Sequence, residues 1–391
     1  MDGLGHSIVA WDEEAVLFFN AKEFHQRRVH EPTFKMVREL FAWGPQNAGY
    51  LKTAPGYDAS VPVHVLGNPR IDMLRDELRD YYQPEVRRLK QRYGKFVIIN
   101  SNFGKLNHAV SRYVVRPGGK DQSVGGAITP FMQRAWTHRM NVFESFKKLV
   151  PYLSSQLPDY NIIVRPHPAE NHQTWRDVAK GLANVHVIHE GPVQNWLLAA
   201  DAMIHNGCTT GIEAYLLGTP TISYQPFIDP ELDFALSNDL GSKATTPQTV
   251  LAAINSFAHK PPKSASAKHK SEKLGLYFSS LQGKLATDLM AAQIANFAER
   301  DNAQGRRSAG IALRAHADSR VRALSKWVAS LIPDHKNSTA YNLQRFPGVT
   351  LLEVDGKIAQ FHNTLGRFNN VKARQFADNI FLISATLSKP L

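Results

Sequence analysis

The sequence predicts an α/β protein built on parallel β-sheets. Short apolar segments of strand length recur along the chain and alternate with segments of helical periodicity, which is typical of βαβ units. Polar or Gly-containing turns follow several of the apolar segments, as they do at the carboxyl ends of strands in a parallel sheet. A chain of 391 residues is long enough for two such domains and an extension.

The first part of the chain is predicted to alternate between strands and helices. A strand at residues 8–11 ends in three acids, and a helix or strand follows over residues 34–41. The other elements expected here are a strand before the turn at 67–69, a charged helix at 73–93, an apolar strand within 95–104, a Gly-rich and mobile polar loop at 105–128, and an amphipathic helix at 129–157.

The second part alternates regularly. Its expected strands are residues 161–164, 185–188, 202–205 and 221–224, and its expected helices are residues 173–182, 193–199, 211–217 and 247–257. The Pro-, Ser- and Lys-rich stretch 259–273 is expected to be exposed, residues 283–332 to be helical, and a final helix and strand to lie within 347–384.

Composition places the chain among ordinary globular proteins, with 43% hydrophobic and 20% charged residues. Cys208 is the only cysteine, so no disulfide or cysteine-based metal cluster can form within one chain, which suits a reducing cytosol. The sequence shows no secretory signal and no apolar run long enough to span a bilayer. We therefore expect a cytoplasmic protein.

The positive charge is concentrated near the end of the chain. Residues 258–391 hold 20 of the Lys and Arg residues against 9 Asp and Glu, whereas residues 1–257 hold 26 against 25. This basic region is either a solvated surface or a face for an anionic membrane, an anionic acceptor or nucleic acid.

The segment NIIVRPHPAEN, residues 161–171, predicts an anion site. An apolar strand ends there in Arg165 and His167, and prolines stiffen the chain around them. Because ligands bind at the carboxyl ends of parallel strands, these two side chains are candidates to contact a phosphate. The alternative is a structural turn at the strand end.

A second candidate is HNGCTTGIEAYLLGTP, residues 205–220, where a polar turn leads directly into a helix. Such a turn presents backbone N–H groups at the positive end of the helix dipole, which favours anions. The hydroxyls of Thr209 and Thr210 add donors, and Glu213, expected on the first helical turn, can accept hydrogen bonds from a ribose diol. His205 could equally be a buried structural histidine, and Asn206 a helix cap.

Three segments carry a resemblance to a known family. RPHPAEN, HNGCTTGIEAYLLGTPTISYQP and GNPRIDML resemble the bacterial surface carbohydrate biosynthesis proteins, which are similar to GT-B-type glycosyltransferases. The Arg-Pro-His-Pro motif is also similar to that of capsule Kdo transferases and of polyol-phosphate transferases of cell-wall polymers. The Glu-bearing helix resembles the nucleotide-binding helix of sugar-nucleotide 2-epimerases. With AWDEEAVLFF and FPGVTLLEV, the resemblance covers nearly the whole chain.

The resemblance implies two Rossmann-like domains that face a cleft, and a nucleotide-sugar donor whose identity stays open. It also implies that Arg165 and His167 contact the donor phosphate and that Glu213 binds ribose. It further implies a phosphate-binding site at the helix terminus, formed by Thr209, Thr210 and Gly211.

Further candidates for the cleft are polar residues at other strand ends. Asn68 and Arg70 in GNPRID can line it, although a tight turn with a helix start explains them as well. Asn100 and Asn102, just before the predicted loop, are possible linker or cleft residues.

Glycosyl transfer also needs a group that takes the acceptor proton or supports the cationic sugar. The acids Asp12, Glu13 and Glu14 are the candidates, since they end a predicted strand, although acids also favour the first turn of a helix. Side chains and a helix end are expected to stabilise the departing phosphate. We find no metal-ligand spacing and expect neither a metal nor a cofactor.

The predicted domains are an N-terminal Rossmann-like, acceptor-side domain over residues 1–104, a C-terminal Rossmann-like domain that binds the nucleotide sugar over residues 105–258, and a basic, mainly helical extension over residues 259–391. Only about 95 residues precede FVIIN, so we expect that the first βαβ unit of the N-terminal domain is missing in comparison with the usual Rossmann-like half. We therefore expect an upstream start or a degenerate copy.

The leading hypothesis is a glycosyltransferase that moves a sugar from a nucleotide donor to a surface polysaccharide or lipid-linked glycan, with the basic region facing an anionic inner membrane. The second is a sugar-nucleotide epimerase on the same scaffold. The third is a non-catalytic, basic protein that binds nucleic acid or glycan. Because aromatic residues are sparse near the basic region and no RNA-binding signature is present, no nucleic acid partner is expected.

Overall fold

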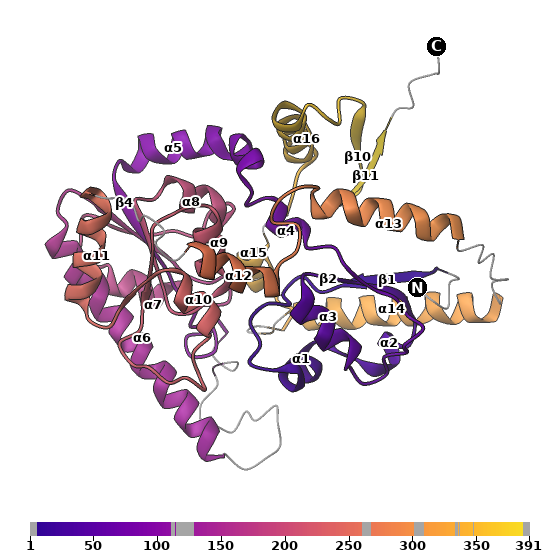
Figure 1. The fold of residues 1–391 in the computed structure, drawn as a ribbon, viewed down its shortest axis with the longest axis horizontal. Helices are drawn as coiled ribbons and strands as arrows, with labels where there is room; N and C mark the ends of the chain where they lie inside the picture. The colour runs from indigo at the N-terminus through magenta and orange to yellow at the C-terminus, as the bar shows by residue number, and fades with distance from the viewer. Residues whose placement is uncertain are drawn as a thin grey trace. The chain divides into compact units, whose positions relative to one another are not determined.

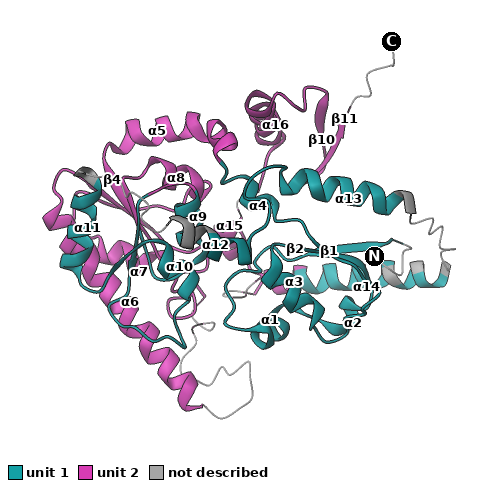
Figure 2. Cartoon of the chain, viewed as in Figure 1, with its two compact units in different colours: residues 1–75, 204–216, 220–326 teal, residues 76–203, 217–219, 327–391 magenta. Residues whose placement is uncertain are grey.

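A computed structural model describes residues 6–110, 114, 129–259, 267–300, 309–332, 335, 337–346 and 348–385 (Figure 1). The chain divides into two compact units (Figure 2). Unit 1 contains residues 1–75, 204–216 and 220–326, and unit 2 contains residues 76–203, 217–219 and 327–391. The expectation for most of the loop 105–128 and for residues 260–266 lies outside the described residues.

A three-stranded parallel sheet forms the first part of unit 1, with the order β1-β2-β3. Every residue of its central strand β2 except Arg38 is buried, and the buried carboxylate of Glu39 accepts a hydrogen bond from the side chain of Gln293 at 2.9 Å. The expectation of a helix or strand at 34–41 is therefore resolved in favour of a strand. The elements of this part are β1 (Ile8–Trp11), α1 (Ala21–Arg28), α2 (Glu31–Phe34), β2 (Val37–Ala42), α3 (Pro45–Lys52), β3 (Val63–Val65) and α4 (Pro69–Asp72).

The segment around α4 forms hydrogen bonds with a distant part of the chain within unit 1. The buried carboxylate of Asp72 accepts hydrogen bonds from the backbone N–H groups of Ala286 and Thr287, both at 2.8 Å, and so caps α13 (Ala286–Arg300). The guanidinium of Arg75 donates to three backbone carbonyls, those of Ser280, Gly283 and Lys284. GNPRIDML therefore has a structural role besides any role in a site.

The second sheet has six strands in the order β6-β5-β4-β7-β8-β9, and the described strand pairs are parallel. Counted from β4, this is the doubly wound order 3-2-1-4-5-6 of Rossmann folds. The prediction of an α/β fold with parallel sheets is confirmed. The strands are β4 (Phe96–Asn100), β5 (Asn161–Arg165), β6 (Val185–Val187), β7 (Ala202–His205), β8 (Thr221–Tyr224) and β9 (Ser242–Ala244).

Strands β4, β5 and β6 lie in unit 2 and β8 and β9 in unit 1, while β7 contains the boundary between the units. The sheet begins at Phe96, ahead of the predicted domain boundary after residue 104. The helices of this α/β part are α5 (Gln83–Tyr93), α6 (Pro130–Gln156), α7 (His172–Val178), α8 (Val193–Ala199), α9 (Thr209–Leu216), α10 (Ala235–Leu240) and α11 (Pro247–His259), and a 3-10 helix covers Asp76–Tyr82.

The core of unit 2 is aromatic as well as aliphatic. The rings of Phe103 and Phe143 lie 4.8 Å apart, and both contact the fully buried Trp175. Phe146 packs edge-on against Phe103. Burial of such large rings contributes much of the stability of a core, so loop residue Phe103 is fixed by packing as well as by hydrogen bonds.

The end of the chain is mainly helical, as expected, but it closes with a hairpin of two antiparallel strands instead of one strand. None of the described helices combines the length and the apolar character needed to cross a bilayer. The remaining elements are α12 (Ala267–Tyr277), α14 (Ala309–Ser330), α15 (Thr339–Arg345), α16 (Leu351–Leu365), β10 (Val371–Ala377) and β11 (Ile380–Ala385).

Candidate functional site

Unit 1 contains a pocket that several of the predicted site residues line. Its polar lining comes from three separate segments: the acids after β1, the start of α4, and α9. The volume of the pocket is about 30 Å³, far below the ~300–1,000 Å³ of typical ligand sites. The lining residues are Glu13, Glu14, Val16, Trp43, Arg70, Ile71, Leu74, Thr209, Ile212, Glu213 and Phe278.

An ion pair joins two of these segments. The guanidinium of Arg70 donates through Nη2 to Oε1 of Glu213 at 3.2 Å, and through Nη1 to the backbone carbonyl of Glu13 at 3.1 Å. Arg70 is about 44% exposed, whereas Glu213 is largely buried. The pair therefore joins a half-exposed cation to a largely buried carboxylate.

Local structure explains the position of Arg70. Asn68 caps α4, because its Oδ1 accepts a hydrogen bond from the backbone N–H of Arg70 at 2.8 Å, and Pro69 occupies the first helical position. Asn68 itself is buried, and its Nδ2 has no hydrogen-bond partner among the described residues. Within GNPRID, the structure therefore places Arg70, and not Asn68, in the pocket lining.

Helix α9 begins at Thr209, directly after β7 and the turn at residues 206–208. Thr209 lines the pocket at the positive end of the helix dipole. Glu213 is the fifth residue of the helix, so it lies at the start of the second turn and not on the first turn, as predicted from the sequence. Its carboxylate remains on the pocket side, where a diol could bind it.

The turn before α9 is packed around His205, which is completely buried. The backbone N–H of Gly207 donates to Nδ1 of His205 at 3.0 Å, so the neutral imidazole carries its proton on Nε2. Nε2 has no partner among the described residues. The ring lies against Gly211: a Cβ atom there would meet Cε1 of His205 at 2.5 Å. His205 thus supports the start of α9, and it does not line the pocket.

Burial lowers the pKa of the His205 imidazole to about 4, whereas a histidine in the unfolded chain has a pKa of about 6.5. Between these values the unfolded state binds more protons, so the free energy of unfolding should fall as the pH falls through this window, by about 3 kcal/mol in total. His205→Gln should flatten the difference between urea unfolding at about pH 7 and at about pH 5. The control is His30→Gln, because His30 is exposed. The prediction would be contradicted if the free energy of unfolding changed equally between the two pH values in both variants.

The acids after β1 differ in their surroundings. Asp12 is held by Arg28, whose Nε donates to Oδ2 at 2.7 Å, and it also accepts from the backbone N–H of Glu14. Glu13 accepts from the indole N–H of Trp11. Of the three acids, Glu13 and Glu14 line the pocket and Asp12 does not.

Arg165 and His167 belong to unit 2. Arg165 ends β5 and is buried; its Nη1 donates to the carbonyl of Glu190 at 2.8 Å and its Nη2 to that of Gly191 at 2.5 Å. Burial lowers the pKa of its guanidinium to about 10. His167 is exposed, and its Nδ1 accepts from the backbone N–H of Ala169. Arg165 therefore stabilises the segment after β6 through hydrogen bonds to its backbone. His167 faces solvent.

Glu170, in the same motif, was not singled out from the sequence. It is fully buried, and its Oε1 accepts hydrogen bonds from Ser101 Oγ at 2.8 Å, from the N–H of Phe103 at 3.0 Å and from the N–H of His167 at 3.1 Å. Its Oε2 accepts from Trp175 Nε1 at 2.8 Å and from the side chain of Asn107 at 3.4 Å. One carboxylate therefore fixes the loop after β4 and the His-Pro turn after β5.

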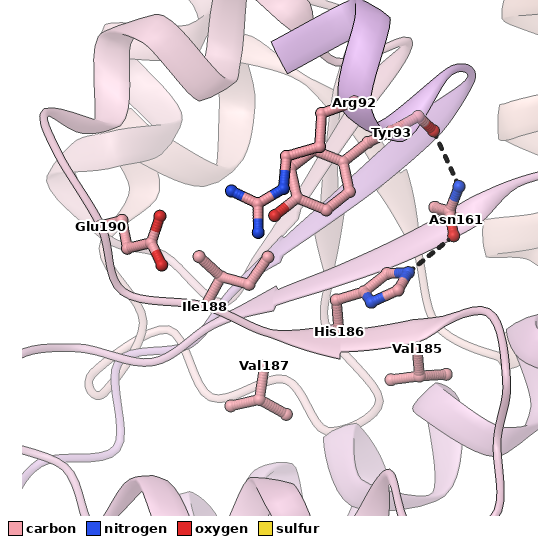
Figure 3. Close-up of a pocket in the computed structure, with 8 residues that line it drawn as sticks. All are labelled: Arg92, Tyr93, Asn161, Val185, His186, Val187, Ile188 and Glu190. Atoms are coloured by element: carbon pink, nitrogen blue, oxygen red, sulfur yellow. Dashed lines mark hydrogen bonds between the residues drawn. The ribbon is translucent and has the colours of Figure 1, made fainter. Parts of the chain in front are cut away.

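Unit 2 also has a wider, open depression of about 650 Å³ beside the edge strand β6 (Figure 3). Nδ2 of Asn161 donates to the carbonyl of Tyr93, and Nε2 of His186 bonds to Oδ1 of Asn161 at 2.7 Å. The guanidinium of Arg92 and the carboxylate of Glu190 complete its charged lining. It has the volume of a ligand site, but none of the site residues predicted from the sequence lines it.

The structure thus brings together Glu13, Glu14, Arg70, Thr209 and Glu213 in unit 1. The pocket lining leaves out the six other predicted residues of unit 1: Asp12, Asn68, His205, Asn206, Thr210 and Gly211. In the part of the chain that the structure describes, no group of three or more His, Cys, Asp or Glu side chains is arranged to hold a metal ion.

No protein-family model and no curated protein matches the chain. Among solved structures, the chain is similar to the wall teichoic acid polymerase TagF (H548A variant), with 15% identity, a TM-score of 0.43, and coverage of 69% of this chain but only 61% of that one. It is similar to the UDP-GlcNAc 2-epimerase from Neisseria meningitidis bound to UDP-GlcNAc, with 14% identity, coverage of 73% and 68%, and a TM-score of 0.42. It is also similar to Anabaena Alr3699/HepE in complex with UDP and glucose, with 13% identity, coverage of 74% and 71%, and a TM-score of 0.39. At TM-scores this low, the likenesses carry no weight for the function of this chain.

Proposed function

We propose that the protein is a metal-independent, GT-B-like glycosyltransferase that moves a sugar from a nucleotide-sugar donor to a surface polysaccharide or lipid-linked glycan. The observation that carries the proposal is the convergence of Glu13, Glu14, Arg70, Thr209 and Glu213 on one pocket of unit 1. These residues were chosen from the sequence for their chemistry, and Arg70 and Glu213 are 143 positions apart.

The pocket as it stands is too small for a nucleotide, so the donor would have to open it. The Arg70–Glu213 pair permits this, because an ion pair with a solvated cation contributes only about 0–1 kcal/mol. Arg70 would turn from Glu213 to the donor phosphate, where a cation stabilises the leaving group. Glu213 would then accept hydrogen bonds from the ribose hydroxyls, and Thr209 at the start of α9 would donate to the phosphate.

Glu14 is our proposed general base. It lines the pocket, and no hydrogen bond to its carboxylate is found among the described residues, whereas Asp12 is engaged by Arg28. A carboxylate in this position can accept the proton of the acceptor hydroxyl during transfer.

In unit 2 we propose that His167, which is exposed, can contact a phosphate group. Direct contact by Arg165 stays a prediction, since two of its nitrogens already bond to backbone carbonyls. We further propose a cytoplasmic location and a glycan or lipid-linked acceptor.

An epimerase is the alternative, because three carboxylates, Glu13, Glu14 and Glu213, line the same pocket. An epimerase needs a base at the sugar and no acceptor. Conversion of a nucleotide sugar without an acceptor would favour it, whereas release of nucleotide that depends on an acceptor would favour the transferase.

Thermal stabilisation by nucleoside mono- and diphosphates tests the proposal. CMP, CDP, UMP and UDP are the probes, and a ligand that binds only the native state stabilises it by about 2.7 kcal/mol at a hundredfold excess over its Kd. Arg70→Ala should weaken the best nucleotide by about tenfold or more, since a hydrogen bond to a charged group contributes ~1.5–3 kcal/mol.

The matched control is Arg88→Ala, which removes an arginine paired with Glu85 on α5 and lies outside the proposed site. It should leave nucleotide affinity unchanged. A chain that no nucleotide stabilises, or equal affinities for the Arg70 and Arg88 variants, would contradict the proposal.

A further inference from the structure

Helix α14 exposes large apolar side chains along its length. Leu313 is 73% exposed, Leu324 is 60% exposed and Trp327 is 61% exposed. From residue 310 to residue 328, every side chain whose burial is described is exposed. An isolated exposed leucine needs no explanation, but a contiguous apolar surface of this kind marks an interaction site.

The apolar residues form one stripe. Leu313, Ala317, Val321, Leu324 and Val328 follow one another at intervals of three or four residues, which places them on one face of an α-helix. Each residue advances the helix by about 100°, so positions two residues away from Leu324 lie on the opposite side. The residues at those positions are Arg322 and Lys326.

The charge of α14 is strongly biased. It contains four basic residues, Arg314, Arg320, Arg322 and Lys326, against the single acid Asp318. Arg314 and Arg320 lie at the margins of the stripe, where their long stems can follow an apolar surface while the guanidinium stays in water. Trp327 also lies at a margin, and tryptophan favours the boundary between apolar and polar phases.

We propose that α14 binds in the plane of an anionic lipid membrane, with the stripe in the headgroup region and Arg314 and Arg320, at the margins of the stripe, close to the lipid phosphates. A helix with an apolar face and a basic face behaves in this way. Since no described helix can cross a bilayer, α14 would lie on the membrane. This inference does not rest on the proposed function: nucleotide binding tests that function, and lipid binding without nucleotide tests this one.

Co-sedimentation of the full chain with phosphatidylcholine vesicles, with and without phosphatidylglycerol, tests the inference. We expect binding to the anionic vesicles, and a loss of about tenfold or more in the double variant Leu324→Ser, Trp327→Ser. The control is Leu352→Ser on α16, where the leucine is even more exposed. A blue shift of tryptophan emission on binding that disappears in Trp327→Phe, while binding persists, would place α14 at the lipid.

The charge requirement has its own pair of variants. Arg314→Glu with Arg320→Glu should abolish the preference for anionic vesicles, whereas the same charge change at the exposed Arg87 and Lys90 of α5 should not. The inference is overturned if the wild-type chain ignores anionic vesicles, or if the serine variant binds them equally. It is also overturned if that variant only converts an oligomer into a monomer in light scattering, because the stripe would then contact a second copy.

Discussion

Replacing Glu170 with alanine should lower the free energy of unfolding by about 4 kcal/mol, because it leaves several buried donors without an acceptor. Three of these donors are backbone or indole N–H groups, those of Phe103, His167 and Trp175, which cannot turn toward water while the fold persists. The loop after β4 and the turn after β5 would lose their common anchor.

Urea unfolding followed by tryptophan emission measures the loss, and hydrogen exchange locates it. The amide of Phe103 should exchange faster in Glu170→Ala even under native conditions, since local opening no longer breaks a bond to a carboxylate. Glu144→Ala is the control, because Glu144 forms a half-exposed pair with Lys147, which should contribute less than ~1 kcal/mol. A Glu170 variant within about 1 kcal/mol of wild type would contradict this account.

The sequence was sufficient for the parallel α/β architecture, because strands such as β4 and β5 are continuous apolar runs that end in polar turns. It could not reveal the role of Glu170. The donors of that carboxylate include Ser101 and Phe103, which lie 69 and 67 positions away, and one acid within a motif carries no mark of burial. Proximity of the motif to a strand end was the only signal.

For the candidate site, too, some residues could be predicted from the sequence and others could not. Residue chemistry at strand ends picked out Arg70, Thr209 and Glu213, and the fold brings them to one pocket. Sequence reasoning proposes His205 and Gly211 as ligand-binding candidates, with a buried structural histidine as the alternative for His205, and in the structure the two residues pack against each other. That difference is a matter of three-dimensional fit, since the ring occupies the space that a side chain at position 211 would need.

Because the ring of His205 lies against Gly211, we expect Gly211→Val to lower the free energy of unfolding by about 4 kcal/mol. This is more than the ~1–3 kcal/mol typical of overpacking in a core. A Cβ at position 211 would lie 2.6 Å from Nε2 of His205 and 2.8 Å from Oγ of Ser237, and both side chains are completely buried. Neither can move without displacing α9 or α10, whose packing holds them.

Gly49→Ala is the matched control, because Gly49 also lies in a helix of unit 1 and an added Cβ there meets nothing within 4 Å. It should be neutral or raise the free energy of unfolding by about 0.5–1 kcal/mol, as expected for a helical glycine. If the two glycine variants unfolded alike, the close approach of His205 to α9 would have no energetic consequence.

A double-mutant cycle separates steric overlap from a general intolerance of α9. Gly211→Ala and His205→Ala should each destabilise the chain, but the pair should lose less than the sum by about 1 kcal/mol or more, because removing the ring makes room for the new methyl group. If Thr209 and Glu213 also bind a nucleotide, the double variant should regain affinity that Gly211→Ala alone loses, since the ring no longer displaces the start of α9. Additive losses of stability would mean that His205 and Gly211 act independently. The conclusion that His205 supports the start of α9, where we propose that phosphate binds, would then be wrong.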